Sequence, residues 1–196
     1  MGDDTGLDSL VSMVDADEMV VYPTSTLPAL GCRPTTSALD LLFEIKQRPA
    51  GMPVSLAVLD LEQAEDLVVV SDAARDLLSS FPLGSITLLL PARTRLDPRL
   101  GGDLIAIRPL AHGSARGLLA ATGPLTATSA NMSGSVALND CLAAARSLGL
   151  PDDAAMPESC RGGPPSTLVT LHPEAIVIRE GVISAHQVAR WSRTRS

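Results

Sequence analysis

The chain has 196 residues, 45% of them hydrophobic, which is enough for one well-buried core and short for two ordinary domains. Its net charge of −7 argues against general affinity for nucleic acid, and an aromatic content of 2% leaves little material for stacking bases. The N-terminus is acidic and the apolar stretches are too short to span a bilayer, so we expect neither a secretory leader nor a membrane segment.

The three cysteines, Cys32, Cys141 and Cys160, form no CxxC pair and are odd in number. A disulfide framework or a zinc site is therefore not expected, and we interpret the chain as a protein of the reducing cytoplasm.

Short apolar runs alternate with helical patterns along most of the chain. Strands are predicted, in chain order, at 19–22, 54–59, 85–90, 104–108, 124–128, 167–171 and 175–179. Helices are predicted at 37–46, near 72–80, near 114–121, near 138–148 and after Ser184, which can cap the last one. Alternation of this kind predicts an α/β protein. The Pro- and Gly-rich residues 151–165 are interpreted as a surface loop.

The helix at 37–46 has the clearest pattern. Ala38, Leu41, Leu42 and Ile45 fall at i, i+3, i+4 and i+7, and Ser37 is the expected cap. Because Pro49 forbids continuation, the segment KQRP is the exit loop of this helix. Lys46 and Arg48 lie two residues apart, so in an extended loop both would point the same way.

Polar side chains gather where the predicted strands end, which is where open α/β sheets bind ligands. These residues are Thr24, Thr26, Ser55, Arg108, Ser129, Asn131, Ser166 and Arg179, together with Lys46 and Arg48 of the helix exit. Arginine offers paired donors and lysine a point charge, so the set suits phosphate or carboxylate ligands. Any one of them could equally be a solvated strand-end residue or a local cap; only their accumulation indicates a site.

The choice between a ligand site and a simple strand end matters most for the stretch GPLTATSANMSG. Thr126 and Thr128 share one face of the strand and Leu125 the other, so we expect a core-facing surface on one side only. Beyond Ser129 the backbone N–H groups lose their ladder partners and become free for a ligand. Asn131 can hold a phosphate oxygen or a carboxylate while fixing the loop.

Several common catalytic motifs are absent from the sequence. There is no GxxxxGK[ST], GxGxxG, HExxH or GxSxG, and the histidines neighbour no obvious nucleophile. An enzyme built from these residues would work by positioning and electrostatics, without a covalent step.

Eight segments together carry a family resemblance: YPTST, KQRP, MPVSLAVLD, SITLLLP, IRPL, TATSANMSG, PSTLV and IREG. Their order and spacing resemble the YrdC/YciO family, which includes threonylcarbamoyl-AMP synthases. The match is strongest over residues 10–190, so the resemblance implies a single YrdC-like domain over residues 1–196. It also implies a YrdC-like twisted mixed β-sheet, flanked by helices, around a large concave cleft.

The resemblance implies an ATP-dependent synthesis of L-threonylcarbamoyl-AMP from L-threonine and bicarbonate or CO2, with Mg²⁺ accompanying ATP and pyrophosphate released. The product would serve tRNA N6-threonylcarbamoyladenosine modification by downstream threonylcarbamoyltransferase proteins. The family's KxR…SxN signature falls on Lys46, Arg48, Ser129 and Asn131, the implied catalytic residues. The implied substrate- and ATP-binding residues are Thr24, Thr26, Ser55, Arg108, Thr128, Ser133, Ser166 and Arg179. No protein ligand of a metal is assigned.

The sequence departs from the family pattern at several cleft segments. It has Ser25 where the pattern has Glu, Pro28 where it has Tyr, and Met52 where a basic residue is usual. Two alternatives therefore stay open: a YciO-like paralogue with another nucleotide-dependent activity, and an RNA-binding module of the same fold. The acidic charge predicts that RNA binding is weak and salt-sensitive at most.

Overall fold

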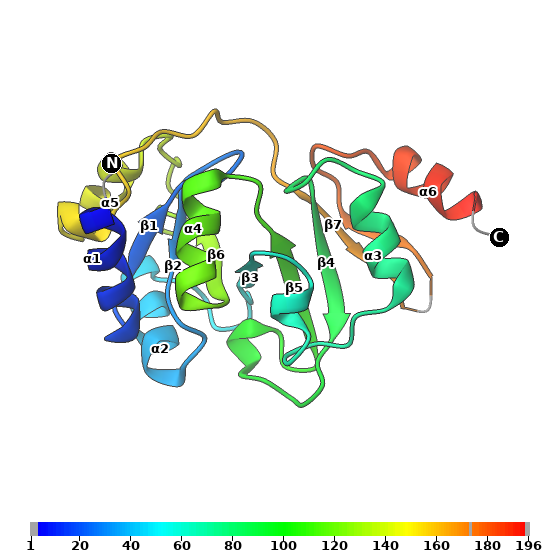
Figure 1. The fold of residues 1–196 in the computed structure, drawn as a ribbon, viewed down its shortest axis with the longest axis horizontal. Helices are drawn as coiled ribbons and strands as arrows, with labels where there is room; N and C mark the ends of the chain where they lie inside the picture. Colours follow the sequence, from blue (N-terminus) through cyan, green and yellow to red (C-terminus); the bar gives the residue numbers. More distant parts are fainter. Residues whose placement is uncertain (1–3, 173, 195–196) are drawn as a thin grey trace.

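One mixed β-sheet of eight strands runs through the described part of the protein (Figure 1). The computed structural model describes residues 4–172 and 174–194. The strands are β1 (Val20–Tyr22), β2 (Ala29–Gly31), β3 (Ser55–Val58), β4 (Ile86–Pro91), β5 (Leu104–Pro109), β6 (Leu125–Ser129), β7 (Thr167–Thr170) and β8 (Ile176–Arg179). Their order in the sheet is β1-β2-β6-β3-β5-β4-β7-β8. The pairs β3–β5 and β4–β7 are parallel, and the remaining neighbours are antiparallel.

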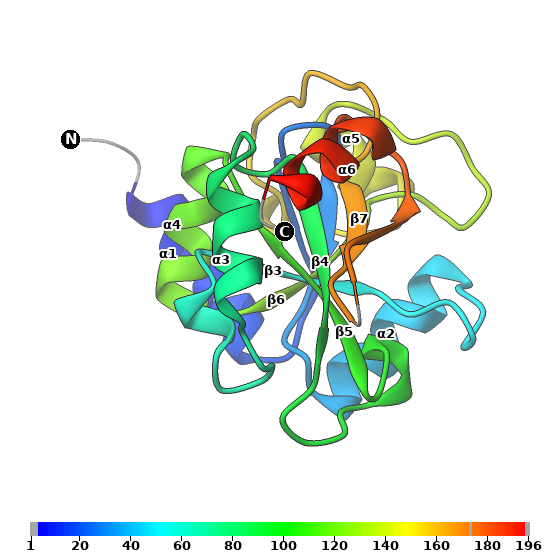
Figure 2. The ribbon, with the colours of Figure 1, turned by 90° about the vertical axis from the view of Figure 1, so that its right-hand side faces the viewer.

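Six α-helices of the described residues accompany the sheet. They are α1 (Asp4–Asp15), α2 (Thr36–Lys46), α3 (Asp72–Ser79), α4 (Gly113–Thr122), α5 (Cys141–Ser147) and α6 (Ala185–Arg193). Helices α1 and α4 lie on one side of the sheet with α2 and α5 on the other, and α3 and α6 lie near the β4–β7–β8 end (Figures 1 and 2). The α/β class and the twisted mixed sheet predicted from the resemblance are confirmed. No helix in the described ranges combines the length and the apolarity needed to cross a membrane.

Two elements escaped the sequence analysis. Strand β2 has only three residues, too few for a periodic pattern, although it pairs with both β1 and β6. Helix α1 did carry a signal, because Leu7, Leu10, Val11 and Val14 follow helical spacing and pack against the sheet. No helix was predicted there, because only the acidic charge of the segment was considered.

Local details correct two further expectations. Thr35, not Ser37, caps α2: its side chain accepts a hydrogen bond from the Ala38 N–H, while the Ser37 hydroxyl donates to Asp17 at 2.6 Å. Ser184 caps α6 as predicted, in a capping box with Gln187. The predicted surface loop 151–165 is partly wrong, because Ala154 is fully buried and the Met156 N–H donates to the Val21 carbonyl of β1.

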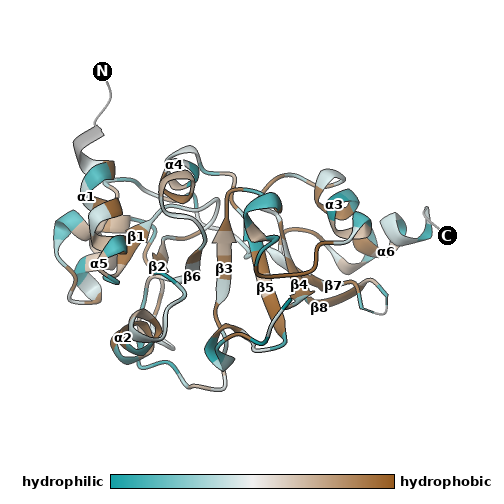
Figure 3. Ribbon diagram, turned by 60° about the horizontal axis from the view of Figure 1, so that its bottom comes forward, coloured by the Kyte–Doolittle hydropathy of each residue, from teal (hydrophilic) through white to brown (hydrophobic). Residues whose placement is uncertain are grey.

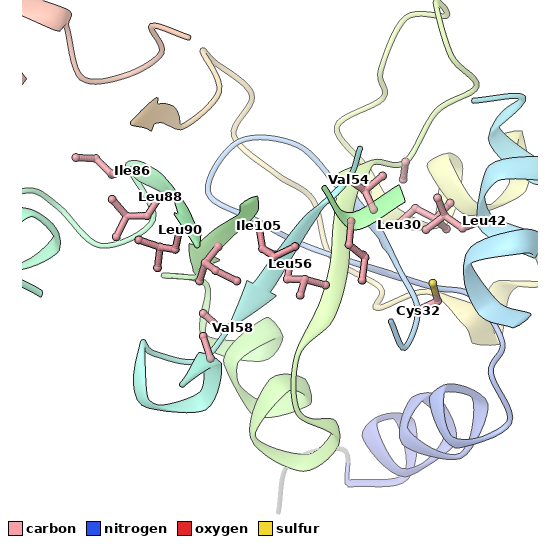
Figure 4. Packing of buried hydrophobic residues seen from close by; sticks show 14 of the residues in the cluster. Leu30, Cys32, Leu42, Val54, Leu56, Val58, Ile86, Leu88, Leu90 and Ile105 are labelled. Carbon is pink, nitrogen blue, oxygen red and sulfur yellow. The ribbon is translucent and has the colours of Figure 1, made fainter. Parts of the chain in front are cut away.

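Apolar side chains cover both faces of the sheet, and β4, β5 and β7 appear as hydrophobic segments in Figure 3. On β1, Val21 belongs to the larger core cluster with α2 and α5, and its neighbours Val20 and Tyr22 belong to a second cluster with α1 and α4. Figure 4 shows the larger cluster extending from Leu30 and Leu42 across the central strands. The rigid sheet carries the polar strand ends described below.

Strand β6 differs from the one-sided strand expected from its pattern. Leu125 and Thr126, which point to opposite faces, are both 0% exposed. Thr126 is tolerated in the core because its hydroxyl accepts a hydrogen bond from the Cys32 N–H at 2.9 Å. The hydroxyl face of β6 is therefore buried at Thr126 and reaches the surface only at its end.

We predict that Thr126→Val destabilises the protein by about 1–3 kcal/mol, since the Cys32 N–H loses its acceptor in a fully buried position. Thr126→Ser keeps the acceptor and is the matched control, costing about 1 kcal/mol for one methyl group. Urea denaturation of the two variants measures the difference. A Val variant as stable as the wild type would contradict the assigned role.

Candidate functional site

A cleft of about 520 Å³ opens where strand ends and loops meet. Its floor comes from β3, β4, β5, β6 and β7, and its rim comes from the segments around residues 24–29, 48–54 and 163–166. The large concave cleft implied by the resemblance is thus present.

Most of the predicted site residues line this cleft. They are Thr24, Thr26, Arg48, Ser55, Arg108, Thr128, Ser129, Ser166 and Arg179. Lys46, Asn131 and Ser133 are not among the lining residues. Two residues of the KxR…SxN signature, Arg48 and Ser129, therefore line the cleft, and the other two, Lys46 and Asn131, do not.

Arg48 reaches the cleft from the loop between α2 and β3. Its Nε donates to the Met52 carbonyl at 2.7 Å and its Nη2 to the Pro53 carbonyl at 2.9 Å, so the loop holds the guanidinium in place. Thr128 of β6 lies 3.4 Å from its remaining nitrogen. Partial burial lowers the pKa of Arg48 from its usual value, which shows that its charge is incompletely solvated.

Arg108 and Arg179 bring two more cations to the cleft, from β5 and β8. Arg108 Nη2 lies 3.3 Å from the Ser25 hydroxyl, and its buried Nε has no hydrogen-bond partner among the described residues. Burial, followed by the field of Arg179, lowers the pKa of Arg108 although Tyr22 opposes the shift. Arg179 donates to the Ser166 carbonyl at 3.0 Å.

No carboxylate belongs to the lining of this cleft within the described residues. Three guanidinium groups thus face one cavity without an anionic partner, and one of them keeps a buried donor unused. Arg48 and Arg108 are half-buried, and charges that are withdrawn from water are normally paired. The arrangement is that of a binding site for anionic ligands such as phosphates and carboxylates.

Lys46 corrects the expectation that it points the same way as Arg48. It is the last residue of α2, and Gln47 then turns the chain in a left-handed conformation with φ 48°. This turn sends the two side chains apart. Lys46 is 1% exposed, and its ammonium donates to the carbonyls of Ser129 and Asn131. It holds the exit of β6 in place from behind the cleft.

Lys46 is the only lysine in the sequence, so its titration can be followed without assignment. Burial, with a smaller contribution from Arg48, lowers its pKa from 10.5 to about 8. Between these two values the unfolded chain holds a proton that the folded chain has released. The contribution of Lys46 to the free energy of unfolding therefore rises with pH across this interval.

We predict that the ¹³Cε resonance of the single lysine titrates near pH 8, and that Lys46→Met removes the corresponding rise in stability between pH 8 and 10.5. Urea denaturation of both proteins across this interval gives the difference in their free energies of unfolding. The contributions of the other titrating groups are the same in both proteins and cancel in this difference. A lysine titrating at its ordinary value, or parallel pH profiles, would contradict the buried ammonium.

Asn131 shapes the loop that Lys46 holds. Its side-chain Nδ2 donates to the carbonyls of Met132 at 3.0 Å and Ser135 at 2.7 Å. The Ser133 N–H donates to the Lys46 carbonyl at 3.0 Å, which ties the same loop to the end of α2. Two roles were expected for Asn131, binding of a ligand and fixing of the loop. Its hydrogen bonds are those of the second role.

We predict that Asn131→Asp lowers the melting temperature more than Asn131→Ala. A carboxylate would face two carbonyl oxygens that now accept hydrogen bonds, whereas alanine leaves room for water to solvate them. Thermal unfolding at neutral pH measures both variants. Equal melting temperatures with a selective loss of ligand affinity in the Asp variant would contradict this role and indicate that Asn131 binds the ligand.

Some lining residues were missed because their side chains carry little chemistry. Leu27, Ala106, Ala127, Gly163 and Leu168 are apolar or lack a side chain, and no pattern marks them as cleft residues. Thr87 did have a signal, as the only hydroxyl inside the apolar segment of β4. Its Oγ1 lies 2.7 Å from the Ser166 hydroxyl.

The geometry defines a class of protein: an α/β fold with a cationic, nucleophile-poor cleft at the ends of its strands. The Sua5/yciO/yrdC family model, described as "Telomere recombination", matches residues 12–181. The chain therefore belongs to this family, and the resemblance seen in the sequence is confirmed.

Relatives within the family carry the name threonylcarbamoyl-AMP synthase. The protein of Stenotrophomonas maltophilia is 38% identical over 136 residues, which are 65% of this chain and 73% of the relative. The protein of Bacillus subtilis is 35% identical over 129 residues, 63% of this chain but only 37% of the relative. This chain thus matches little more than a third of the longer relative.

Solved structures show the same fold. Sua5 from P. abyssi, complexed with L-threonine, has a TM-score of 0.84 at 26% identity, covering 97% of this chain and 58% of that one. YciO from E. coli has a TM-score of 0.76 at 24% identity, covering 96% of this chain and 95% of that one. The first of these chains is much longer than the present one, and the second is similar in length.

Proposed function

We propose that this chain synthesises L-threonylcarbamoyl-AMP from L-threonine, bicarbonate or CO2, and ATP, releasing pyrophosphate. The observation that carries the proposal is the set of three arginines, Arg48, Arg108 and Arg179, facing one cleft without a carboxylate. A triphosphate, an amino-acid carboxylate and bicarbonate are all anions that guanidinium groups bind well. The names of the relatives, and the threonine bound to P. abyssi Sua5, support the amino acid.

The reaction suits a site that has no activated nucleophile. The amine of threonine captures CO2 to give a carbamate, and a carbamate oxygen then attacks the α-phosphate of ATP while pyrophosphate leaves. In this scheme Arg48 neutralises charge on the phosphates, and Thr128 and Ser129 bind beside it. Lys46 acts through the loop that it holds and is a positioning residue.

Magnesium fits the proposal as part of the nucleotide. The described residues contain no cluster of His, Cys, Asp or Glu suited to a metal ion, and the cleft lining has no carboxylate. Mg²⁺ would therefore be held chiefly by the phosphates of ATP and enter as the MgATP substrate, helping to neutralise charge as pyrophosphate leaves.

The proposed product places the protein early in tRNA modification. Downstream threonylcarbamoyltransferase proteins would take the threonylcarbamoyl group from the adenylate to N6 of adenosine, in the cytoplasm. Direct RNA contact is not required for the proposed step, and the net charge of −7 favours weak RNA binding at most.

The test is mass-spectrometric detection of threonylcarbamoyl-AMP from the purified chain with L-threonine, bicarbonate and MgATP. We predict that Arg108→Met lowers the rate at limiting substrate by about 10- to 100-fold, the range for losing a charged hydrogen bond. Arg95→Met is the matched control, because Arg95 is 70% exposed, forms an ion pair with Asp103 and does not line the cleft. Equal rates in the two variants would contradict the anion site.

Other outcomes of the same assay favour the alternatives. Adenylate formation with a different amino acid or acid, and none with threonine, would indicate a YciO-like paralogue. No product at all, combined with nanomolar affinity for duplex RNA at physiological salt, would indicate an RNA-binding module.

A further inference from the structure

Two of the three cysteines are neighbours in the fold although they are far apart in the sequence. An isolated antiparallel bridge joins Asp140 to Ser159. Cys141, the first residue of α5, and Cys160 directly follow the two bridged residues on the two antiparallel segments, so they are diagonal neighbours whose side chains point to the same side. Both are buried, at 0% and 8% exposure. Their thiols interact through a hydrogen bond.

The two thiols are chemically unequal. The hydrogen bond from Cys141 lowers the pKa of Cys160, and the Thr24 N–H and Arg108 act in the same direction, against burial and Glu158. The same hydrogen bond raises the pKa of Cys141, and burial, Asp140 and Glu158 add to this shift. Cys160 is therefore the better nucleophile of the pair and Cys141 the proton donor.

The pair is connected to the cleft. Thr24, whose N–H faces the Cys160 sulfur, is a lining residue, as is Arg108. Two residues after Cys160, the Gly162 N–H donates to the Thr26 carbonyl at 2.8 Å. The segment that carries Cys160 thus supports the backbone of the YPTST loop from behind.

We propose that Cys160 and Cys141 form a peroxide-sensitive thiol pair, whose oxidation to a disulfide loosens the Thr24 edge of the cleft. The oxidant is a hydroperoxide, small enough to reach the edge of Cys160 that is exposed. Neither the arginine site nor the proposed adenylate chemistry uses these thiols.

The chemistry balances in two steps. The Cys160 sulfur attacks one oxygen of hydrogen peroxide, the O–O bond breaks, and the leaving hydroxide takes the proton that the Cys160 thiol gives up and becomes water, which leaves a sulfenic acid on Cys160. The Cys141 sulfur then attacks the Cys160 sulfur, the S–O bond breaks, and a second water leaves with the Cys141 proton. The two sulfurs lose two electrons, which reduce the peroxide to two waters.

Oxidation changes the cleft edge for two reasons. A disulfide sulfur is a much weaker acceptor than a thiolate, so the Thr24 N–H loses its partner. Diagonal neighbours across an antiparallel bridge are about 7–8 Å apart, whereas a disulfide requires Cα atoms about 4.4–6.8 Å apart. Closing the bond therefore pulls the Cys160 segment towards α5 and away from the YPTST loop.

Thiol counting after peroxide treatment tests the first half of the proposal. After unfolding in denaturant, alkylation should label three cysteines in the reduced chain and Cys32 alone in the oxidised chain, with three labels restored by dithiothreitol. Cys32 is the internal control, because burial raises its pKa to about 12. Three free thiols after peroxide, or a disulfide that includes Cys32, would overturn the proposal.

Amide hydrogen exchange tests the second half without relying on the proposed activity. Exchange of the peptide containing Thr24 should accelerate about tenfold on oxidation, as expected for one lost hydrogen bond. Cys141→Ser should stop at a sulfenic acid on Cys160 that dimedone traps, and Cys160→Ser should resist peroxide altogether. Unchanged exchange at Thr24 in the disulfide form, or an oxidised Cys141 in the Cys160→Ser variant, would overturn it.

Discussion

The buried ammonium of Lys46 is the interaction on which the geometry of the cleft depends. It joins three parts of the chain: the end of α2, the end of β6 and the loop that follows. A lysine this deeply buried is expensive to keep charged, and the lowered pKa measures that cost. Its two carbonyl partners, one on the last residue of β6 and one in the loop that follows, offset part of the penalty.

The contacts of Lys46 affect the cleft through the backbone of β6 and of the loop that follows it. With the carbonyls of Ser129 and Asn131 fixed from behind, the end of β6 presents Thr128 and Ser129 to the cleft that Arg48 also lines. The left-handed turn at Gln47 separates the two cations, one inside the wall and one at its surface. The two cations of the KxR motif therefore have different roles. Lys46 supports the cleft wall from inside, and Arg48 supplies a charge that faces the ligand.

The sequence predicted what depends on local pattern. Seven strands and five helices were placed within a few residues, because apolar runs bounded by Pro and Gly mark strands clearly. It could not predict that Lys46 turns inward, because that direction is set by one left-handed residue and by carbonyls 83 and 85 positions away. The buried position of Thr126 escaped for the same reason, since its partner Cys32 directly follows a strand too short to recognise.

The departures from the family pattern gain a physical meaning from the charges around Arg108. Where the pattern has a glutamate, Ser25 gives Arg108 a neutral hydroxyl partner at 3.3 Å, so the charge of this arginine stays available to a ligand. Where the pattern has a basic residue, Met52 lines the cleft without charge and is 54% exposed. Of these two positions only Met52 lines the cleft, so the lining has no cation at position 52, and Arg108 keeps its charge without a carboxylate at position 25. An anionic group of the substrate would then be attracted away from position 52 and towards Arg108, where partial burial strengthens its interaction with the guanidinium.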